Sequence, residues 1–192
     1  MSLTISEVKS SIEKVVSGIR LKQVRDSLLI EDPAKLPEVA RFLKTSPDYK
    51  LDYLSSITAS DFINYLESVY HLYSMEKKTG PLVLRVRVPR DNAKMPSLMP
   101  VFRGAEFQER ENFDLYGIVY EGHPDLRRIF MWEGFEGHPM RKDYVQEDSE
   151  TLDKDDIAWL DAHAVAIPDD IRKRAENPPE KKAPPTESNQ EN

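Results

Sequence analysis

Hydrophobic residues in the first part of the chain follow two different periods. Over residues 6–19 and 36–43 they recur every three or four positions, which predicts two amphipathic helices. Residues 24–30 mix aliphatic and polar side chains and stop before Asp32-Pro33, as a strand does when a proline follows it. The predicted order of this region is helix, strand, helix.

Three later segments predict strands: residues 49–58, 65–75 and 82–88. The last alternates with period two and follows a turn at 78–81, so it has one apolar and one solvated face. The apolar face would carry Leu82, Leu84, Val86 and Val88, and the solvated face Arg85 and Arg87. The predicted fold class is α+β, a two-layer sandwich of a mixed or antiparallel sheet with helices mainly on one face.

The second half of the chain predicts shorter helices. Residues 96–102 have apolar positions at helical spacing, and a second helix is expected from Ala105 to the stop signal at Gly117. After a run of loops, residues 153–163 predict one more helix.

Charge and proline content divide the chain into three parts. Residues 1–144 carry 21 acidic and 21 basic side chains, and they are expected to form the α+β domain. Residues 145–170 carry nine acidic and one basic side chain, so 145–176 are interpreted as an extended, acidic, partner-binding arm. Residues 177–192 begin with a proline-rich stretch that has little to bury, which predicts a disordered tail.

Composition narrows the classes of function. The 192 residues contain no cysteine, so the chain offers no thiolate ligands for iron–sulfur clusters. An even charge balance in the domain and an acidic arm argue against nucleic acid as a partner, because phosphate binding needs a basic face. The sequence has no apolar stretch of the roughly 20 residues that a membrane helix requires.

A unit of aromatic residue, Glu, Gly, His and Pro occurs twice, at residues 120–124 and 135–139. One hypothesis makes His123 and His138 metal ligands, with Asp125 or Glu136 as a third. The other makes them hydrogen-bonded residues of Gly-His-Pro turns. Metal sites need three or four converging ligands, and no HExxH pair is present, so the sequence favours turns.

The charged cluster at Glu109, Arg110, Glu111 and Asp114 also has two interpretations. Arg110 lies four residues from both Glu106 and Asp114, so these charges could form a solvated row on a helix. Paired carboxylates could instead perform acid–base chemistry, but nothing nearby in the sequence marks a substrate pocket. Neither G-x-G-x-x-G nor a phosphate-binding P-loop is found.

Taken together, four segments closely resemble the signature of the C subunit of respiratory complex I, the NADH:quinone oxidoreductase: residues 109–111, 114–118, 122–129 and 134–144. The resemblance covers roughly residues 20–144. It implies a cofactor-free structural subunit of the peripheral arm that docks on the D subunit, which helps form the quinone site. In such a complex FMN and iron–sulfur clusters belong to partner subunits, and electron transfer from NADH to quinone is coupled to proton translocation.

The resemblance also implies a hetero-oligomer at the cytoplasmic face of the bacterial cell membrane, attached to the membrane only through the complex. Related alternatives are the equivalent subunit of a membrane-bound hydrogenase or an NDH-type complex; a small histidine-dependent metal enzyme and a lone binding module are alternatives of other classes. Thirteen residues are expected to contact partners, and none to be catalytic or to bind a cofactor or metal: Glu109, Arg110, Glu111, Asp114, His123, Pro124, Asp125, Arg127, Arg128, His138, Pro139, Arg141 and Lys142.

Overall fold

The computed structural model describes residues 4–144, 154–163, 167 and 172–173. The chain divides into two compact units, unit 1 (Met1–Lys142) and unit 2 (Asp143–Asn192). The tail expected over residues 177–192 and most of the arm expected over 145–176 lie outside the described residues.

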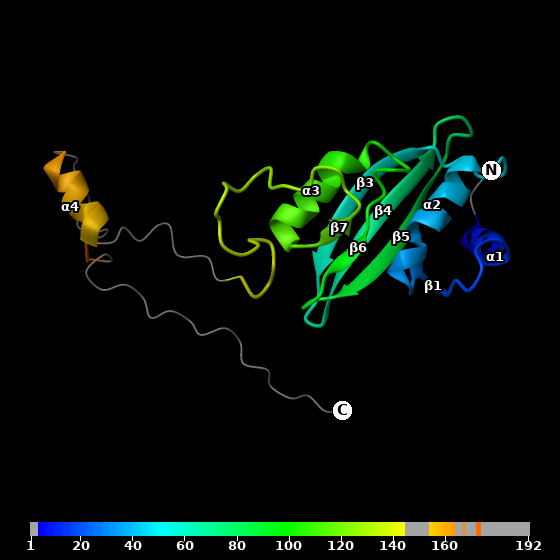
Figure 1. The fold of residues 1–192 in the computed structure, drawn as a ribbon, viewed down its shortest axis with the longest axis horizontal. Helices are drawn as coiled ribbons and strands as arrows, with labels where there is room; N and C mark the ends of the chain where they lie inside the picture. The colour runs from blue at the N-terminus through cyan, green and yellow to red at the C-terminus, as the bar shows by residue number, and fades with distance from the viewer. Residues whose placement is uncertain (1–3, 145–153, 164–166, 168–171, 174–192) are drawn as a thin grey trace, which may run out of the picture. The chain divides into compact units, whose positions relative to one another are not determined.

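Unit 1 is built on a five-stranded sheet with the strand order β1-β2-β5-β4-β3 (Figure 1). Strands β2 and β5 pair in parallel and the other neighbours pair antiparallel, so the sheet is mixed. A second, two-stranded parallel sheet joins β6 to β7. In chain order the elements are α1 (Ile5–Val15), β1 (Leu21–Val24), β2 (Ser27–Ile30), the 3-10 helix η1 (Pro33–Lys35), α2 (Leu36–Thr45), β3 (Tyr53–Asp61), β4 (Tyr65–Ser74), β5 (Thr79–Pro89), β6 (Lys94–Pro96), α3 (Ala105–Tyr116) and β7 (Val119–Glu121).

One face of the large sheet meets the helices and forms the core. Along β5 the side chains of Leu84 and Val86 are fully buried, as period-two alternation predicts, and they pair with Tyr70 and Ser68 of β4. The apolar side chains of α1 and α2 belong to the same core cluster. The predicted α+β architecture, with the helices mainly on one face, is confirmed.

The opposite face carries charge. The side chain of Glu67 on β4 is only 1% exposed and accepts hydrogen bonds from Arg85 Nη1 at 2.5 Å and Arg87 Nε at 2.7 Å, both on β5. The Arg87 guanidinium also lies 4.6 Å from the centre of the Tyr65 ring. Arg85 and Arg87 are therefore on the predicted face, where they cover a buried carboxylate.

The segment 24–30, predicted as one strand, is instead part of a hairpin. Strands β1 and β2 pair antiparallel around Arg25-Asp26, with Arg25 at a φ of 51°. The Ser27 hydroxyl donates to the Val24 carbonyl at 2.6 Å and closes the turn. The prediction was wrong because two polar residues between aliphatic ones fit a turn as well as the polar face of a strand.

The helix predicted over residues 96–102 is also wrong. Pro96 ends β6, and the chain then forms a turn in which the Phe102 amide donates to the Leu98 carbonyl at 2.7 Å. Pro96 and Pro100 have no amide hydrogen to donate, which disfavours a regular helix here. The apolar residues pack into the core from this turn, and Lys44 of α2 donates to the Val101 carbonyl at 2.5 Å.

The remaining predicted elements are present with shifted ends. The first helix stops at Val15, because the chain turns at Gly18 with a φ of 69°. The strand expected at 49–58 is β3, and the helix expected up to Gly117 is α3. In unit 2, α4 (Lys154–Ala162) confirms the helix expected there. Within the described part of the chain, no helix is long and apolar enough to cross a bilayer.

Truncation of a side chain should lower the free energy of unfolding by different amounts on the two faces of β5. Val86 is fully buried in the core, whereas Val83 is partly exposed on the opposite face. Val86→Ala should lower the free energy of unfolding by about 2 kcal/mol, and Val83→Ala by less than about 1 kcal/mol. Urea unfolding followed by circular dichroism measures both; equal costs would contradict the assigned register.

Candidate functional site

Helix α3 is the element around which the site is built. It begins at Ala105 beside β3, and its Gln108 side chain accepts a hydrogen bond from the Ile57 amide on that strand. Its buried side chains are mostly polar: Glu109, Arg110, Asn112 and Asp114, with Ala105. The expectation of a solvated row of charges on this helix is therefore wrong for Glu109, Arg110 and Asp114, whereas Glu111 is exposed.

Glu109 ties α3 to the turn that follows β6. Its carboxylate accepts from the Ser97 hydroxyl at 2.5 Å and from the Leu98 amide at 2.7 Å. Burial raises the pKa of Glu109 to about 7, against the opposing effect of these two hydrogen bonds. The carboxyl group therefore holds its proton to a higher pH than an ordinary glutamate does.

A second buried polar cluster lies between α3, β4 and β7. The Tyr120 hydroxyl is 3.1 Å from the Ser68 hydroxyl and accepts from Asn112 Nδ2 at 3.1 Å. Tyr70 donates to Met95 Sδ at 3.2 Å. Burial raises the pKa of both Tyr70 and Tyr120, so both phenols stay protonated. Sequence analysis missed this cluster because its members come from four separate elements, α3, β4, β6 and β7, and give no local signal.

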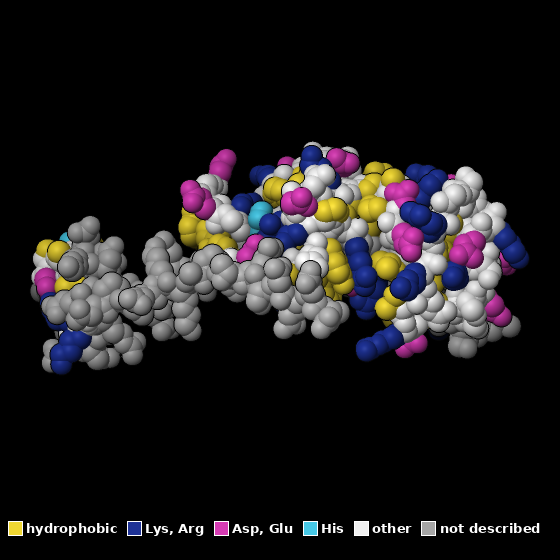
Figure 2. All heavy atoms as spheres, turned by 90° about the horizontal axis from the view of Figure 1, so that it is seen from below, with side chains coloured by type: hydrophobic (Ala, Val, Ile, Leu, Met, Phe, Trp, Pro, Cys, Tyr) yellow, Lys and Arg dark blue, Asp and Glu magenta, His cyan; other side chains and the backbone are white. Residues whose placement is uncertain are grey.

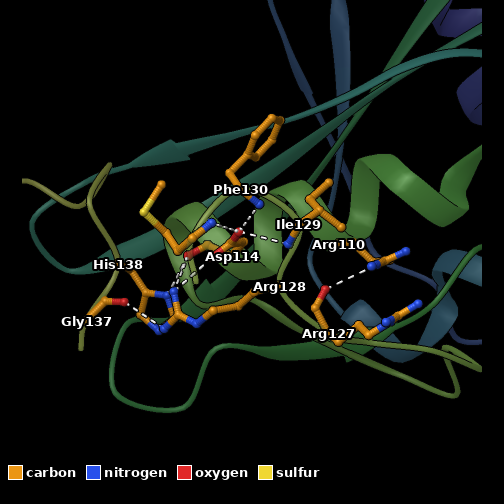
Figure 3. A network of polar contacts seen from close by, with 9 residues as sticks. Arg110, Asp114, Arg127, Arg128, Ile129, Phe130, Gly137 and His138 are labelled. Atoms are coloured by element: carbon orange, nitrogen blue, oxygen red, sulfur yellow. Dashed lines mark hydrogen bonds and ion pairs between the residues drawn. The ribbon is translucent and has the colours of Figure 1, made fainter. Parts of the chain in front are cut away.

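Asp114 holds the loop of residues 122–142, called the signature loop below. Asp114 Oδ1 accepts from Arg128 Nη1 at 2.8 Å (Figure 3). Its Oδ2 accepts from three successive backbone amides, those of Ile129 at 3.0 Å, Phe130 at 2.7 Å and Met131 at 2.9 Å. Burial alone would raise the pKa of Asp114, but these hydrogen bonds outweigh it and the pKa is lowered.

The two histidines of the repeated unit both bond to backbone carbonyls of α3. His123 Nε2 lies 3.0 Å from the Glu106 carbonyl, and its Nδ1 accepts from the Asp125 amide at 3.1 Å, which fixes the Nε2–H tautomer. His138 Nδ1 lies 3.0 Å from the Asp114 carbonyl. The repeat thus fastens the loop at two points along the helix, separated by eight residues or roughly 12 Å.

These contacts agree with the interpretation of the histidines as turn residues. Burial lowers the pKa of His138, helped by the nearby charges of Arg141 and Arg128, so the ring is neutral and can donate from Nδ1. Among the residues that the structure describes, no group of three His, Cys, Asp or Glu side chains is placed to hold a metal ion. His123 and His138 are hydrogen-bonded turn residues.

The end of α3 is capped by the same loop. Helix ends leave carbonyl groups without partners inside the helix. The Leu115 carbonyl accepts from the Met140 amide at 3.1 Å, and the Tyr116 carbonyl accepts from Arg141 Nε at 2.6 Å. Gly117 follows with a φ of 73°, and a Cβ atom there would overlap the His138 ring. The predicted helix stop is therefore also a point of close approach between helix and loop.

Arg110, Arg127 and Arg128 make further contacts within this region. Arg110 Nε donates to the Arg127 carbonyl at 3.2 Å, and its Nη1 is 3.8 Å from Asp125 Oδ2. Arg127 pairs with the same carboxylate at 3.0 Å. Arg128 donates to the Gly137 carbonyl at 2.9 Å in addition to its ion pair with Asp114.

The last predicted residues lie at the two ends of the loop. The Lys142 amide donates to Asp61 Oδ2 at 2.6 Å, and Asp61 also forms an ion pair with Arg90. Pro124 is exposed and Pro139 is partly buried. The structure thus brings all thirteen predicted residues to α3 or the loop beside it, mostly through bonds within this chain. Their contact with a partner stays a prediction.

Large apolar side chains lie on the outer side of this region. Phe130 is 59% exposed, Trp132 is 68% exposed, and Phe107 and Met140 are also exposed. Figure 2 shows hydrophobic and acidic side chains together at the left end of unit 1, which the signature loop forms in Figure 1. Sequence analysis did not single out these residues; the available signal was aromatic residues within a segment rich in glycine turns.

The raised pKa of Glu109 predicts an unusual pH dependence of the free energy of unfolding. The folded state binds its proton more tightly than the unfolded chain does, so stability falls as pH rises from about 4.5 to about 7. The difference from the ordinary pKa of 4.5 corresponds to about 3 kcal/mol. In urea unfolding at several pH values, the stability of the wild type relative to Glu109→Gln should therefore fall over this range, because the opposite contribution of His138, whose pKa is lowered, is the same in both proteins. The exposed Glu111→Gln should keep the wild-type profile, and an unchanged profile for Glu109→Gln would contradict the assignment.

Asp114→Asn should release the loop. The change leaves Arg128 without its carboxylate and sets an amide group against backbone donors, which should cost about 3 kcal/mol or more. Limited trypsin digestion should then cut after Arg128 at least tenfold faster. Glu111→Gln, which changes an exposed carboxylate on the same helix, should change stability by about 1 kcal/mol or less. Equal digestion of the two variants would show that Asp114 does not hold the loop.

Comparisons with known proteins agree with this framework. Residues 29–150 match the family described as respiratory-chain NADH dehydrogenase, 30 Kd subunit. The NADH-quinone oxidoreductase C subunit 2 of Rhizobium meliloti (strain 1021) is 46% identical over 118 residues, which are 58% of this chain and 62% of that protein. The C subunit from Rhodopseudomonas palustris (strain BisB18) is 36% identical over 141 residues, 71% of this chain and 69% of that protein.

A solved structure shows the same fold. It comes from a membrane-bound sulfane sulfur reductase, an archaeal respiratory membrane complex, and is 23% identical with a TM-score of 0.58, covering 93% of this chain and 98% of that chain. The matched residues span 60% to 65% of the length of four of the NADH-quinone oxidoreductase relatives. On the family match and these identities, the chain belongs to the family of the respiratory-chain NADH dehydrogenase 30 Kd subunit, the C subunit of complex I.

Proposed function

We propose that this chain is a cofactor-free structural subunit of the peripheral arm of an NADH:quinone oxidoreductase. The proposal rests on the contacts that the motif residues make within this chain. Asp114, His123 and His138 are all bonded to groups of this chain, where they hold the signature loop against α3. Side chains committed in this way stabilise a surface instead of meeting a substrate.

Its partners in this proposal are the other subunits of the complex, chiefly the D subunit at the quinone site. FMN and iron–sulfur clusters reside in those partners. The absence of cysteine from this sequence supports this placement for the clusters. The complex transfers electrons from NADH to quinone and couples this to proton translocation. The chain reaches the cytoplasmic face of the bacterial membrane only through its partners.

The sequence relatives favour NADH over another electron donor. The first relatives are NADH-quinone oxidoreductase subunits at 46% and 45% identity, whereas the sulfane sulfur reductase complex has only the fold in common, at 23% identity. The fold alone is compatible with a related hydrogenase or NDH-type complex.

Recovery of the complex tests the proposal. A tagged copy of the chain, extracted in mild detergent from membranes of the native host, should migrate with a large assembly that oxidises NADH with a quinone acceptor. Mass spectrometry should identify the D subunit in that assembly, and cross-linking should join it directly to this chain. The isolated chain should be colourless and should not oxidise NADH. Migration as a free chain, or a flavin spectrum in the isolated chain, would overturn the proposal.

A further inference from the structure

We propose that Trp132, with Phe130 two residues before it, is the anchor by which the signature loop binds a partner protein, in an apolar pocket with basic residues at its rim. This inference rests on the proposed function and names the chemistry of its interface. It differs from the sequence-based expectation, because the anchor is aromatic and two of the charged motif residues, Asp114 and Arg128, support it from within.

Trp132 is exposed but held in place. The Phe135 amide donates to the Trp132 carbonyl at 3.2 Å, and Gly134 between them has a φ of 92°, which fits a type II turn. The Trp132 ring meets the edge of the Phe135 ring with centroids 4.7 Å apart. A tryptophan that is 68% exposed and yet fixed by a turn and a ring contact loses little entropy on binding.

The support continues to the buried carboxylate. The Arg128 guanidinium lies 5.6 Å from the centre of the Phe135 ring and is fixed by its ion pair with Asp114. The Phe130 amide bonds to the same carboxylate, and Figure 3 shows its ring pointing away from the network. Asp114 therefore helps to position both exposed aromatic residues. It binds Phe130 through its amide, and it supports Trp132 through Arg128 and Phe135.

Charge beside the anchor indicates the kind of partner. Glu133 lies within the turn and Glu136 directly follows it, and both are exposed, whereas the basic Arg128 is partly buried and already paired. An aromatic residue flanked by carboxylates is complementary to an apolar pocket that lysine or arginine residues border. Such central tryptophans are frequent among residues that dominate binding energy.

The same charges disfavour two other binding partners for this surface, a lipid membrane and a second copy of the chain. Anionic lipid headgroups would repel Glu133 and Glu136, so a membrane surface is a poor match. In a two-fold symmetric dimer the same patch faces itself, which would bring these acidic pairs together. The partner that remains is a different protein chain.

Replacement of the native copy by tagged variants tests the anchor. Trp132→Ala should lower the fraction of the chain found in the assembly at least tenfold, and Trp132→Phe should restore most of it. Tyr53→Ala is the matched control, because Tyr53 is also exposed and lies at the opposite end of β3 from Asp61, which contacts the loop. Glu133→Lys should lower assembly and Glu7→Lys should not, although both change the net charge equally.

Unfolding, vesicle binding and dimer formation are measured on the isolated chain. Trp132→Ala should keep the wild-type unfolding midpoint within a few degrees, because the side chain is mostly exposed. If the wild type assembles and Trp132→Ala assembles as Tyr53→Ala does, the anchor is refuted while the proposed function stands. Failure of the wild type itself to assemble refutes the proposed function. Sedimentation with phosphatidylglycerol vesicles, or a dimer in ultracentrifugation, refutes the protein-partner assignment if Trp132→Ala abolishes it.

Discussion

The buried carboxylate of Asp114 is the constraint on which the functional region depends. A charge without solvent is costly unless donors surround it, and here three consecutive amides and one guanidinium do so. Those donors all come from residues 128–131, which form no regular secondary structure. The energy that keeps Asp114 ionised is therefore the same energy that gives this loop one conformation.

This arrangement explains why a helix with so many polar residues lies in the interior. Helix α3 runs beside β3, and its buried groups face two sides. Glu109 and Asn112 bond toward the turn after β6 and toward β7, whereas Arg110 and Asp114 bond toward the signature loop. Polar contacts of this kind are directional, so they specify the register of the loop along the helix more narrowly than apolar packing would.

The same loop has two chemically different sides. Its inner side consists of hydrogen bonds from His123, His138 and Arg141 to carbonyls of α3. Its outer side presents Phe130 and Trp132, with carboxylates beside them. The buried residues of the charged motif thus hold the loop against α3, and under the proposal above the aromatic residues on the outer side make the contact with a partner.

The helices, strands and turns that depend on neighbouring residues could be predicted from the amino-acid sequence alone. The spacing of apolar residues located α2 and the buried face of β5, Gly117 marked the end of α3, and the motif from Glu109 onward identified the family. Each of these signals lies within a few residues, where the geometry of a helix, strand or turn fixes the outcome. Which charged side chains are buried depends instead on contacts between residues that are distant in the sequence. Asp114 and the amides it binds are fifteen to seventeen residues apart, and no local pattern distinguishes a carboxylate that will meet them from one in water.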